Sequence, residues 1–87
     1  MNTYEKAINE VIAILINHNV PFTVNQIYEG LQLRFPWCDG DVACHEGTYG
    51  AENGKVETYE FPWDEGDVSM LTPADCAMRI ARLWVFG

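Results

Sequence analysis

Apolar positions recur at helical spacing near both ends of the chain. Near the start, a stripe that includes Ile8, Val11 and Leu15 predicts an amphipathic helix over residues 3–18. Near the end, Thr72 is a suitable N-cap and Pro73 a suitable first helical residue, so a helix is predicted from Thr72 onward. The residues that we expect this second helix to bury are Cys76, Ile80, Leu83 and Trp84.

Local start signals predict a further helix between these two. Thr23 and Gln26 have the T-x-x-Q spacing of a capping box, and Phe22 and Ile27 are spaced as a hydrophobic staple. Pro36 would end the helix at about the residue before it, because that residue is pushed toward extended backbone. The pattern therefore predicts three helices in total.

The middle of the chain is predicted to form a β-hairpin. Its arms are residues 41–49 and 55–63, and the second arm is rich in β-branched and aromatic residues. Asn53 and Gly54 are the predicted turn, since both tolerate a positive φ. The expected fold is α+β, with three helices packed on a small antiparallel β-hairpin or sheet, in a single domain of residues 1–87.

The acidic charge of the chain is concentrated around this hairpin. The formal net charge is −8, and residues 39–67 hold nine acidic residues against one lysine. Such a segment repels nucleic acid, which binds through lysine and arginine, and it favours a basic protein surface. The nine acids, which we expect to lie in solvent, are Asp39, Asp41, Glu46, Glu52, Glu57, Glu60, Asp64, Glu65 and Asp67.

An eight-residue segment occurs twice, and its two copies would bracket the predicted hairpin at its base. Residues 35–42 read FPWCDGDV and residues 61–68 read FPWDEGDV, so six of eight positions are identical. We interpret both copies as the same kind of turn, in which proline fixes φ and glycine supplies a positive φ. The alternative is a pair of aromatic and acidic knuckles that grip a partner together.

Candidate catalytic and metal-binding residues lack the spacing that their chemistry needs. Cys38, Cys44 and His45 have the residue types of a zinc site without its spacing, and the acidic runs do not complete a calcium-binding loop. No nucleophile is paired with a base in a recognisable motif, so we expect neither an enzyme nor a cofactor. An odd number of cysteines and the absence of a signal-peptide pattern predict a cytoplasmic setting, the host cytoplasm if the chain is phage-encoded.

Two resemblances suggest functions. Residues 22–31 look like the first helix of a helix-turn-helix or winged-helix module, and residues 71–84 are similar to its recognition helix. This resemblance implies a transcriptional regulator that would use Arg34, Arg79 and Arg82. In size, acidity and lack of catalytic residues, the chain also resembles, in type, the small inhibitors of phages and mobile elements. Anti-CRISPR and anti-restriction DNA mimics are examples, and they imply carboxylates that occupy a groove meant for phosphates.

We hypothesise from these observations that the protein is a non-enzymatic inhibitor. Its acidic hairpin would occupy a basic, nucleic-acid-binding surface of a host protein, with no direct contact to nucleic acid or membrane. The nine acids would contact the partner, and Trp37 and Trp63 would be apolar anchors beside them. The alternatives are a degenerate winged-helix regulator and a homo-oligomerising assembly protein with exposed aromatic residues.

Overall fold

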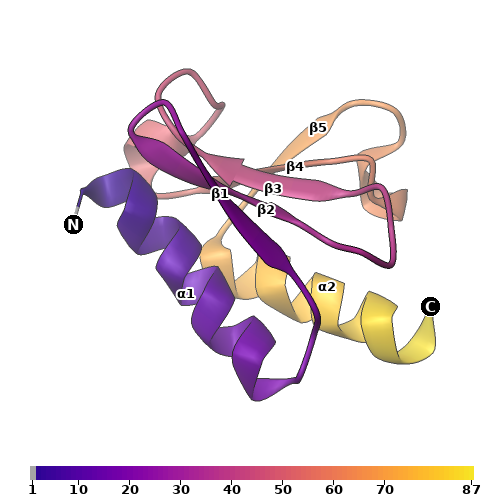
Figure 1. The fold of residues 1–87 in the computed structure, drawn as a ribbon. Coiled ribbons are helices and arrows are strands. Elements are labelled where there is room, and N and C mark those ends of the chain that lie inside the picture. The colour runs from indigo at the N-terminus through magenta and orange to yellow at the C-terminus, as the bar shows by residue number, and fades with distance from the viewer. Residues whose placement is uncertain (1) are drawn as a thin grey trace.

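The computed structural model describes residues 2–87 as two α-helices and a five-stranded antiparallel sheet (Figure 1). The strands lie in the order β1-β2-β3-β4-β5, so each strand pairs with the next one in sequence. Two short 3-10 helices, η1 (Ala51–Asn53) and η2 (Pro62–Asp64), lie in the loops. The main elements are α1 (Thr3–Asn17), β1 (Thr23–Ile27), β2 (Gly30–Arg34), β3 (Asp41–Cys44), β4 (Val56–Tyr59), β5 (Val68–Leu71) and α2 (Pro73–Phe86).

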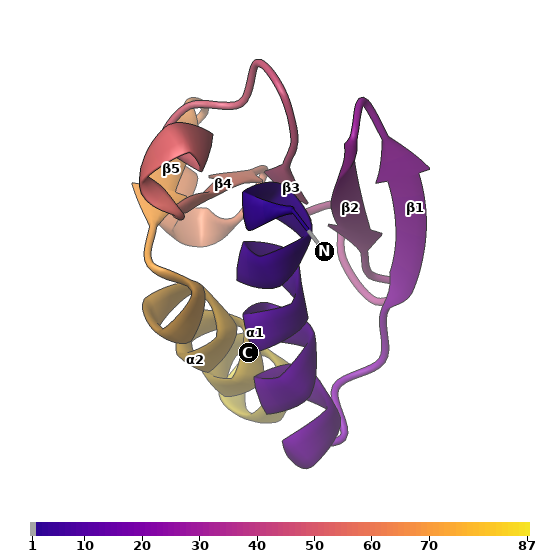
Figure 2. The ribbon, with the colours of Figure 1, turned by 90° about the vertical axis from the view of Figure 1, so that its left-hand side faces the viewer.

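Both helices cover the same face of the sheet, which gives a molecule of two layers (Figure 2). Leu33, Val42 and Val56, from three neighbouring strands, are fully buried in one core with residues of α1 and α2. The helices contribute Ala7, Ile8, Val11, Leu15, Cys76, Ala77, Ile80 and Ala81 to this core. Because β1 lies on the side of α1 away from α2, most of its residues are exposed.

The expected arrangement of three helices on a small hairpin is wrong, although the α+β class is correct. Residues 23–34, predicted as a helix, form the β1–β2 hairpin, in which Thr23 pairs with Arg34 and Ile27 with Gly30. The Thr23 hydroxyl does not cap a helix; it donates a hydrogen bond to the Arg34 carbonyl across the hairpin (3.5 Å). Pairing of β2 with β3 outweighs the local helix signals here.

The turn of this hairpin explains why its sequence did not indicate it. Only Tyr28 and Glu29 lie between the paired residues Ile27 and Gly30, and both have a positive φ, of 42° and 64°. Two-residue turns of this kind usually contain Asn-Gly, because other residues are strained there. Gly30 follows, and a Cβ at that position would overlap the carbonyl oxygen of Cys44 on β3. Glycine thus allows the close approach of the two strands.

The predicted hairpin in the middle of the chain is confirmed in part. β3 and β4 pair as expected, with Ala43 opposite Glu57, but both strands are shorter than the predicted arms. The predicted turn at Asn53 and Gly54 is the end of the η1 turn, inside a loop of residues 45–55. β5 was not predicted, and it lengthens the sheet beyond the hairpin.

The helix predictions at the two ends of the chain are confirmed. Asn2 caps α1 by accepting from the Glu5 amide (2.9 Å), and the Glu5 carboxylate accepts from the Asn2 amide in return (3.3 Å). The Thr72 hydroxyl caps α2 by accepting from the Asp75 amide (3.2 Å). Both helix starts are therefore determined by local sequence.

Replacing Tyr28 by Asn and Glu29 by Gly together should stabilise the protein by about 1–2 kcal/mol, because both new residues tolerate the positive φ. The free energy of unfolding, from denaturant titration, measures the effect. Glu29→Gly alone should give a smaller gain. Since Gly opposes helix formation, a loss of stability would contradict the hairpin and favour the helix predicted from sequence.

Candidate functional site

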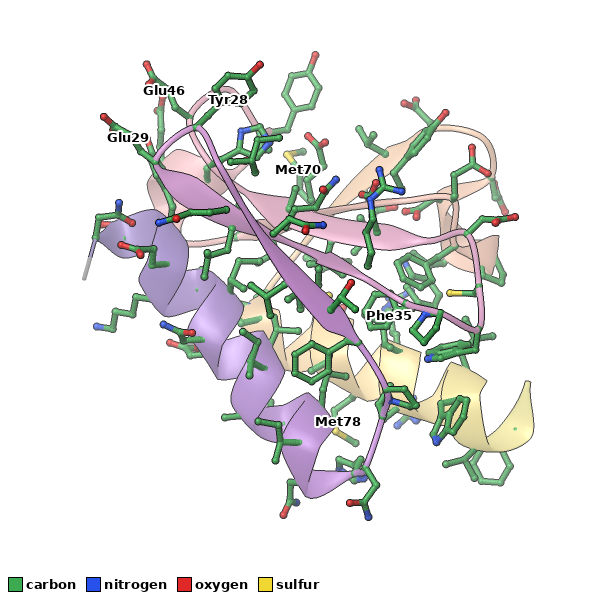
Figure 3. All side chains as sticks on the ribbon, in the orientation of Figure 1. Tyr28, Glu29, Phe35, Glu46, Met70 and Met78 are labelled. Carbon is green, nitrogen blue, oxygen red and sulfur yellow. The ribbon has the colours of Figure 1, made fainter. Side chains whose placement is uncertain are left out.

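The two Phe-Pro-Trp segments lie at the same end of the sheet. The β2–β3 connection carries the first segment, and the β4–β5 connection carries the second. In an antiparallel sheet of this order, these two connections lie at the same end of the strands (Figure 1). Phe35 and Phe61 are both buried, and their rings pack edge to face at 5.8 Å between centroids. Phe35 lies between the sheet and α2 (Figure 3). The repeat thus brings its two copies into contact.

The two copies are not the same turn, although both were predicted to be. Gly66 of the second copy has a φ of +83°, as expected for glycine in a turn. Gly40, its counterpart, serves a different purpose: a Cβ there would lie 2.5 Å from the ring of Phe61. The glycine of the first copy therefore makes room for the phenylalanine of the second. This interlocking fixes the two loops relative to each other.

A buried carboxylate holds the second copy in shape. Asp64 is 4% exposed; it accepts hydrogen bonds from the Thr58 hydroxyl (2.8 Å) and the Phe61 amide (3.1 Å). The same Thr58 hydroxyl accepts from the Trp63 indole N–H (3.1 Å). The expectation that every acid of the segment lies in solvent is thus wrong for Asp64. Its carboxylate is a structural acceptor that a partner cannot reach.

Trp63 is covered by groups of its own chain. Its ring stacks on Phe61, with centroids 4.6 Å apart and the planes within 6°. The guanidinium of Arg79, on α2, lies 5.7 Å from the centroid of the same indole. Arg79 is held there by an ion pair with Asp75 (3.1 Å). Trp63, predicted as an anchor for a partner, is therefore half-buried and already has a cationic neighbour.

Trp37, the other predicted anchor, lies beside an open groove. Its indole N–H donates to the Pro21 carbonyl (3.0 Å), and its ring lies 5.2 Å from that of Trp84, tilted by 51°. Trp84 was expected to be buried, but it is 41% exposed. We call this the Trp37 groove; it has a volume of about 460 Å³, and its walls include Trp37, Asp39, Glu60, Phe61, Leu83 and Trp84.

The nine predicted acids are distributed over four places, one of which is the buried position of Asp64. At the groove end, four are exposed: Asp39, Glu60, Glu65 and Asp67. Glu46 and Glu52 lie in the β3–β4 loop at the opposite end of the sheet, where Figure 3 shows Glu46 near Glu29 and Tyr28. Asp41 and Glu57 are half-buried on the face of the sheet away from the helices. With Asp64 buried, the groove end combines four exposed acids with the exposed indole of Trp84 beside an open groove.

Carboxylates surround Asp41 and Tyr59, which pair with each other where β3 begins and β4 ends. Burial raises the pKa of Asp41; Arg34 lowers it, and the carboxylates of Glu57, Asp64 and Glu60 raise it further. The pKa of Tyr59 is raised mainly by a hydrogen bond with Glu60 and by the charge of that carboxylate. Anions are disfavoured at this end of the molecule, and cations are attracted.

The cysteines do not form a reactive or metal-binding group. Burial raises the pKa of Cys38 and of Cys44, and it raises the pKa of Cys76 to about 12, so these side chains are neutral thiols at physiological pH. Cys38 precedes β3 and Cys44 ends it, which places them toward opposite ends of that strand. Across residues 2–87, no three His, Cys, Asp or Glu side chains gather closely enough to hold a metal ion.

Sequence reasoning missed the contribution of α2 to the site. Leu83 and Trp84 fall on the stripe of α2 that faces the core, so they were predicted as buried residues. The helix continues beyond the strands, and its last turn passes the two loops (Figure 1). Trp84 is partly exposed because it lies in this last turn, beyond the strands. A tryptophan at the end of an apolar stripe was the available signal.

Replacing Thr58 by Val should lower the free energy of unfolding by about 1–3 kcal/mol, because it removes one of the two hydrogen bonds to the buried Asp64 carboxylate and leaves the Trp63 indole without its acceptor. The control is Ser69→Ala, which removes the hydroxyl of the residue paired with Thr58 on β5. Denaturant titration followed by tryptophan fluorescence measures both variants. Equal, small effects would show that the Asp64 network is not important for stability.

Asp41→Asn should stabilise the protein at neutral pH. The folded state raises the pKa of Asp41, so ionising this group costs stability as the pH rises above its ordinary pKa of 3.8. The advantage of the Asn variant should fall as the pH is lowered and vanish below that value. Unfolding measured across this pH range tests the effect. A variant less stable than the wild type at neutral pH would mean that attraction by Arg34 outweighs burial.

Comparisons with known proteins give the site no precedent. No helix among residues 2–87 is long and apolar enough to cross a membrane. Because the comparisons found no similar protein, the function of the groove is inferred from its own geometry. No protein-family model, curated protein or solved structure matches this chain.

Proposed function

We propose that this protein is a non-enzymatic binding protein that docks its groove end on a basic surface of a partner protein. The observation that carries the proposal is the combination, at one end of the sheet, of an open aromatic groove with four exposed carboxylates. Interfaces of this composition have aromatic anchors in the centre and a charged rim. The surface that best complements them is apolar at its centre and surrounded by lysine and arginine.

The partner surface is one that normally binds nucleic acid, and occupation by this protein inhibits that binding. Carboxylates on a rigid scaffold present negative charges where phosphates would lie, and a site that neutralises phosphates also attracts them. The interlocked loops support this view, because Gly40 and the edge-to-face phenylalanine rings fix the backbone that carries the acids. A preorganised surface loses less entropy on binding than a flexible acidic tail does.

We assign this contact to fewer residues than the sequence suggested. Asp39, Glu60, Glu65 and Asp67 form the acidic rim, and Trp37 and Trp84 are the aromatic anchors. Asp64 and Trp63 do not belong to this set. The Asp64 carboxylate already accepts a hydrogen bond from Thr58, and the Arg79 guanidinium lies over the Trp63 indole. Glu46 and Glu52 lie at the opposite end of the sheet, and Asp41 and Glu57 are half-buried on the sheet.

The winged-helix alternative loses its structural basis. Residues 22–31 form β1 and the start of β2, so the first helix of a helix-turn-helix is missing. Arg79 is engaged by Asp75 and Trp63, Arg82 lies three residues further along α2, and Arg34 lies on β2 and not on a helix. These three arginines do not form the continuous basic face that DNA binding needs.

Self-association is a second candidate function, favoured by one observation. The last turn of α2 exposes Trp84, Val85 and Phe86, of which Phe86 is 86% exposed. Contiguous exposed apolar residues mark contact surfaces on small proteins. If this turn joins two copies, light scattering should show a mass that rises with concentration, and Phe86→Ser should abolish the rise. A monomer at all concentrations would exclude this candidate.

Charge reversal at the groove end should abolish capture of the partner. The test variant carries Asp39→Lys, Glu60→Lys and Glu65→Lys, and the control carries Glu29→Lys, Glu46→Lys and Glu52→Lys, all at exposed positions. Each set adds six charges to the net −8, so both variants have the same net charge. Any difference in partner capture between the two variants therefore depends on where the charges lie and not on net charge.

The measurement is an affinity pull-down from host lysate, with elution by duplex DNA. The wild type and the control variant should capture the same nucleic-acid-binding protein and release it to DNA, and the test variant should not capture it. Equal capture by the two variants would contradict a contact at the groove end. Capture that DNA cannot displace would contradict occupation of a nucleic-acid site.

A further inference from the structure

The molecule already contains one binding arrangement for a guanidinium group. Arg79 lies over the indole of Trp63, 5.7 Å from its centroid, and its Nε is 3.1 Å from the Asp75 carboxylate. The cation thus has an aromatic face on one side and a carboxylate beside it. Trp63 belongs to the second Phe-Pro-Trp segment. The first segment can be compared with it position by position.

The first segment has the same groups in an open arrangement. Trp37 occupies the position of Trp63, and Trp84 lies against it at 5.2 Å and a tilt of 51°, so that the two indoles form adjacent walls. Asp39 and Glu60, which also line the groove, supply two carboxylates. Among the described residues, no arginine or lysine lines this groove. The complementary cation has to come from another molecule.

We infer that the Trp37 groove holds an arginine side chain of the partner protein. The inference rests on the proposed function and specifies its central contact. A guanidinium is planar, so it stacks on an indole face, and it donates in a fork that matches a carboxylate. It is also less strongly hydrated than the ammonium of lysine, which lowers the cost of entering a groove with aromatic walls. An apolar side chain would leave both carboxylates of the groove unused.

The charges around the groove agree with this occupant. Asp39 and Glu60 are exposed at its rim, and Glu65 and Asp67 lie in the adjoining β4–β5 loop. An anionic or phosphate-bearing ligand would be repelled by all four. The groove volume of about 460 Å³ accommodates one long side chain with part of the backbone that carries it. The arginine would therefore enter from a loop or an extended segment of the partner.

The test compares two short peptides by two-dimensional NMR. An acetylated hexa-arginine amide and the matching hexa-lysine amide are titrated into the ¹⁵N-labelled protein, and the three indole N–H signals are followed. The arginine peptide should shift the Trp37 and Trp84 signals, leave Trp63 nearly unchanged and bind roughly threefold tighter than the lysine peptide. Equal affinity for the two peptides, or shifts at Trp63 alone, would overturn the inference.

Matched variants separate a specific site from general attraction to an acidic protein. Trp84→Leu should remove the preference for arginine, whereas Tyr49→Leu, at an exposed aromatic residue in the β3–β4 loop, should keep it. Asp39→Asn with Glu60→Gln should weaken binding more than Glu46→Gln with Glu52→Gln, although the change in net charge is equal. Thermal unfolding checks that each variant is folded. Equal weakening by the two pairs would overturn the inference.

Failure of this inference and failure of the proposed function give different results. If the peptides bind equally and Trp84→Leu has no effect, while charge reversal at Asp39, Glu60 and Glu65 still abolishes capture of the partner, the arginine contact is wrong and the function stands. If the arginine preference is found but capture survives that charge reversal, the groove binds arginine and the proposed docking surface is wrong.

Discussion

The groove end of this molecule depends on the buried carboxylate of Asp64. One side chain fixes the Thr58 hydroxyl on β4 and the backbone amide of Phe61, and through Thr58 it also positions the Trp63 indole. A buried carboxylate without these donors would be costly, so the loop has one well-defined conformation. Since Phe61 packs on Phe35 and under Gly40, that conformation also determines where the first loop lies. Both loops at the groove end are thus fixed by this polar network and the packing of Phe61.

The repeated segment shows how similar sequences take different roles when their neighbours differ. Cys38 is half-buried beside the groove, whereas its counterpart Asp64 is buried and accepts hydrogen bonds. Trp63 is covered by Arg79, whereas Trp37 meets another tryptophan and remains accessible. One copy therefore stabilises the loop pair, and the other provides open surface. In the proposed binding site, one rigid copy thus supports one accessible copy.

Sequence reasoning succeeded where the signal is local and failed where contacts between distant segments decide. The helix starts at Asn2 and Thr72 are set by side chains within three residues, so α2 could be predicted from its cap and α1 from its apolar stripe. The β1–β2 hairpin could not, because its turn at Tyr28 and Glu29 lacks the usual residues and its strands gain stability from β3. Of the residues that line the groove, Trp37, Asp39 and Glu60 had been singled out from the sequence. Burial of Asp64 and the approach of Trp84 depend on packing across the fold.

The order of the strands has a consequence for how the chain is synthesised and folds. Each strand pairs with its successor, so the sheet can form hairpin by hairpin through contacts that are close in sequence. The packing of α1 on α2 is different, because it joins the two ends of the described chain. During translation, Trp84 emerges after both Phe-Pro-Trp loops. The groove is therefore the last part of the molecule to be completed, and a nascent chain on the ribosome cannot present it before the helix that closes the core has docked.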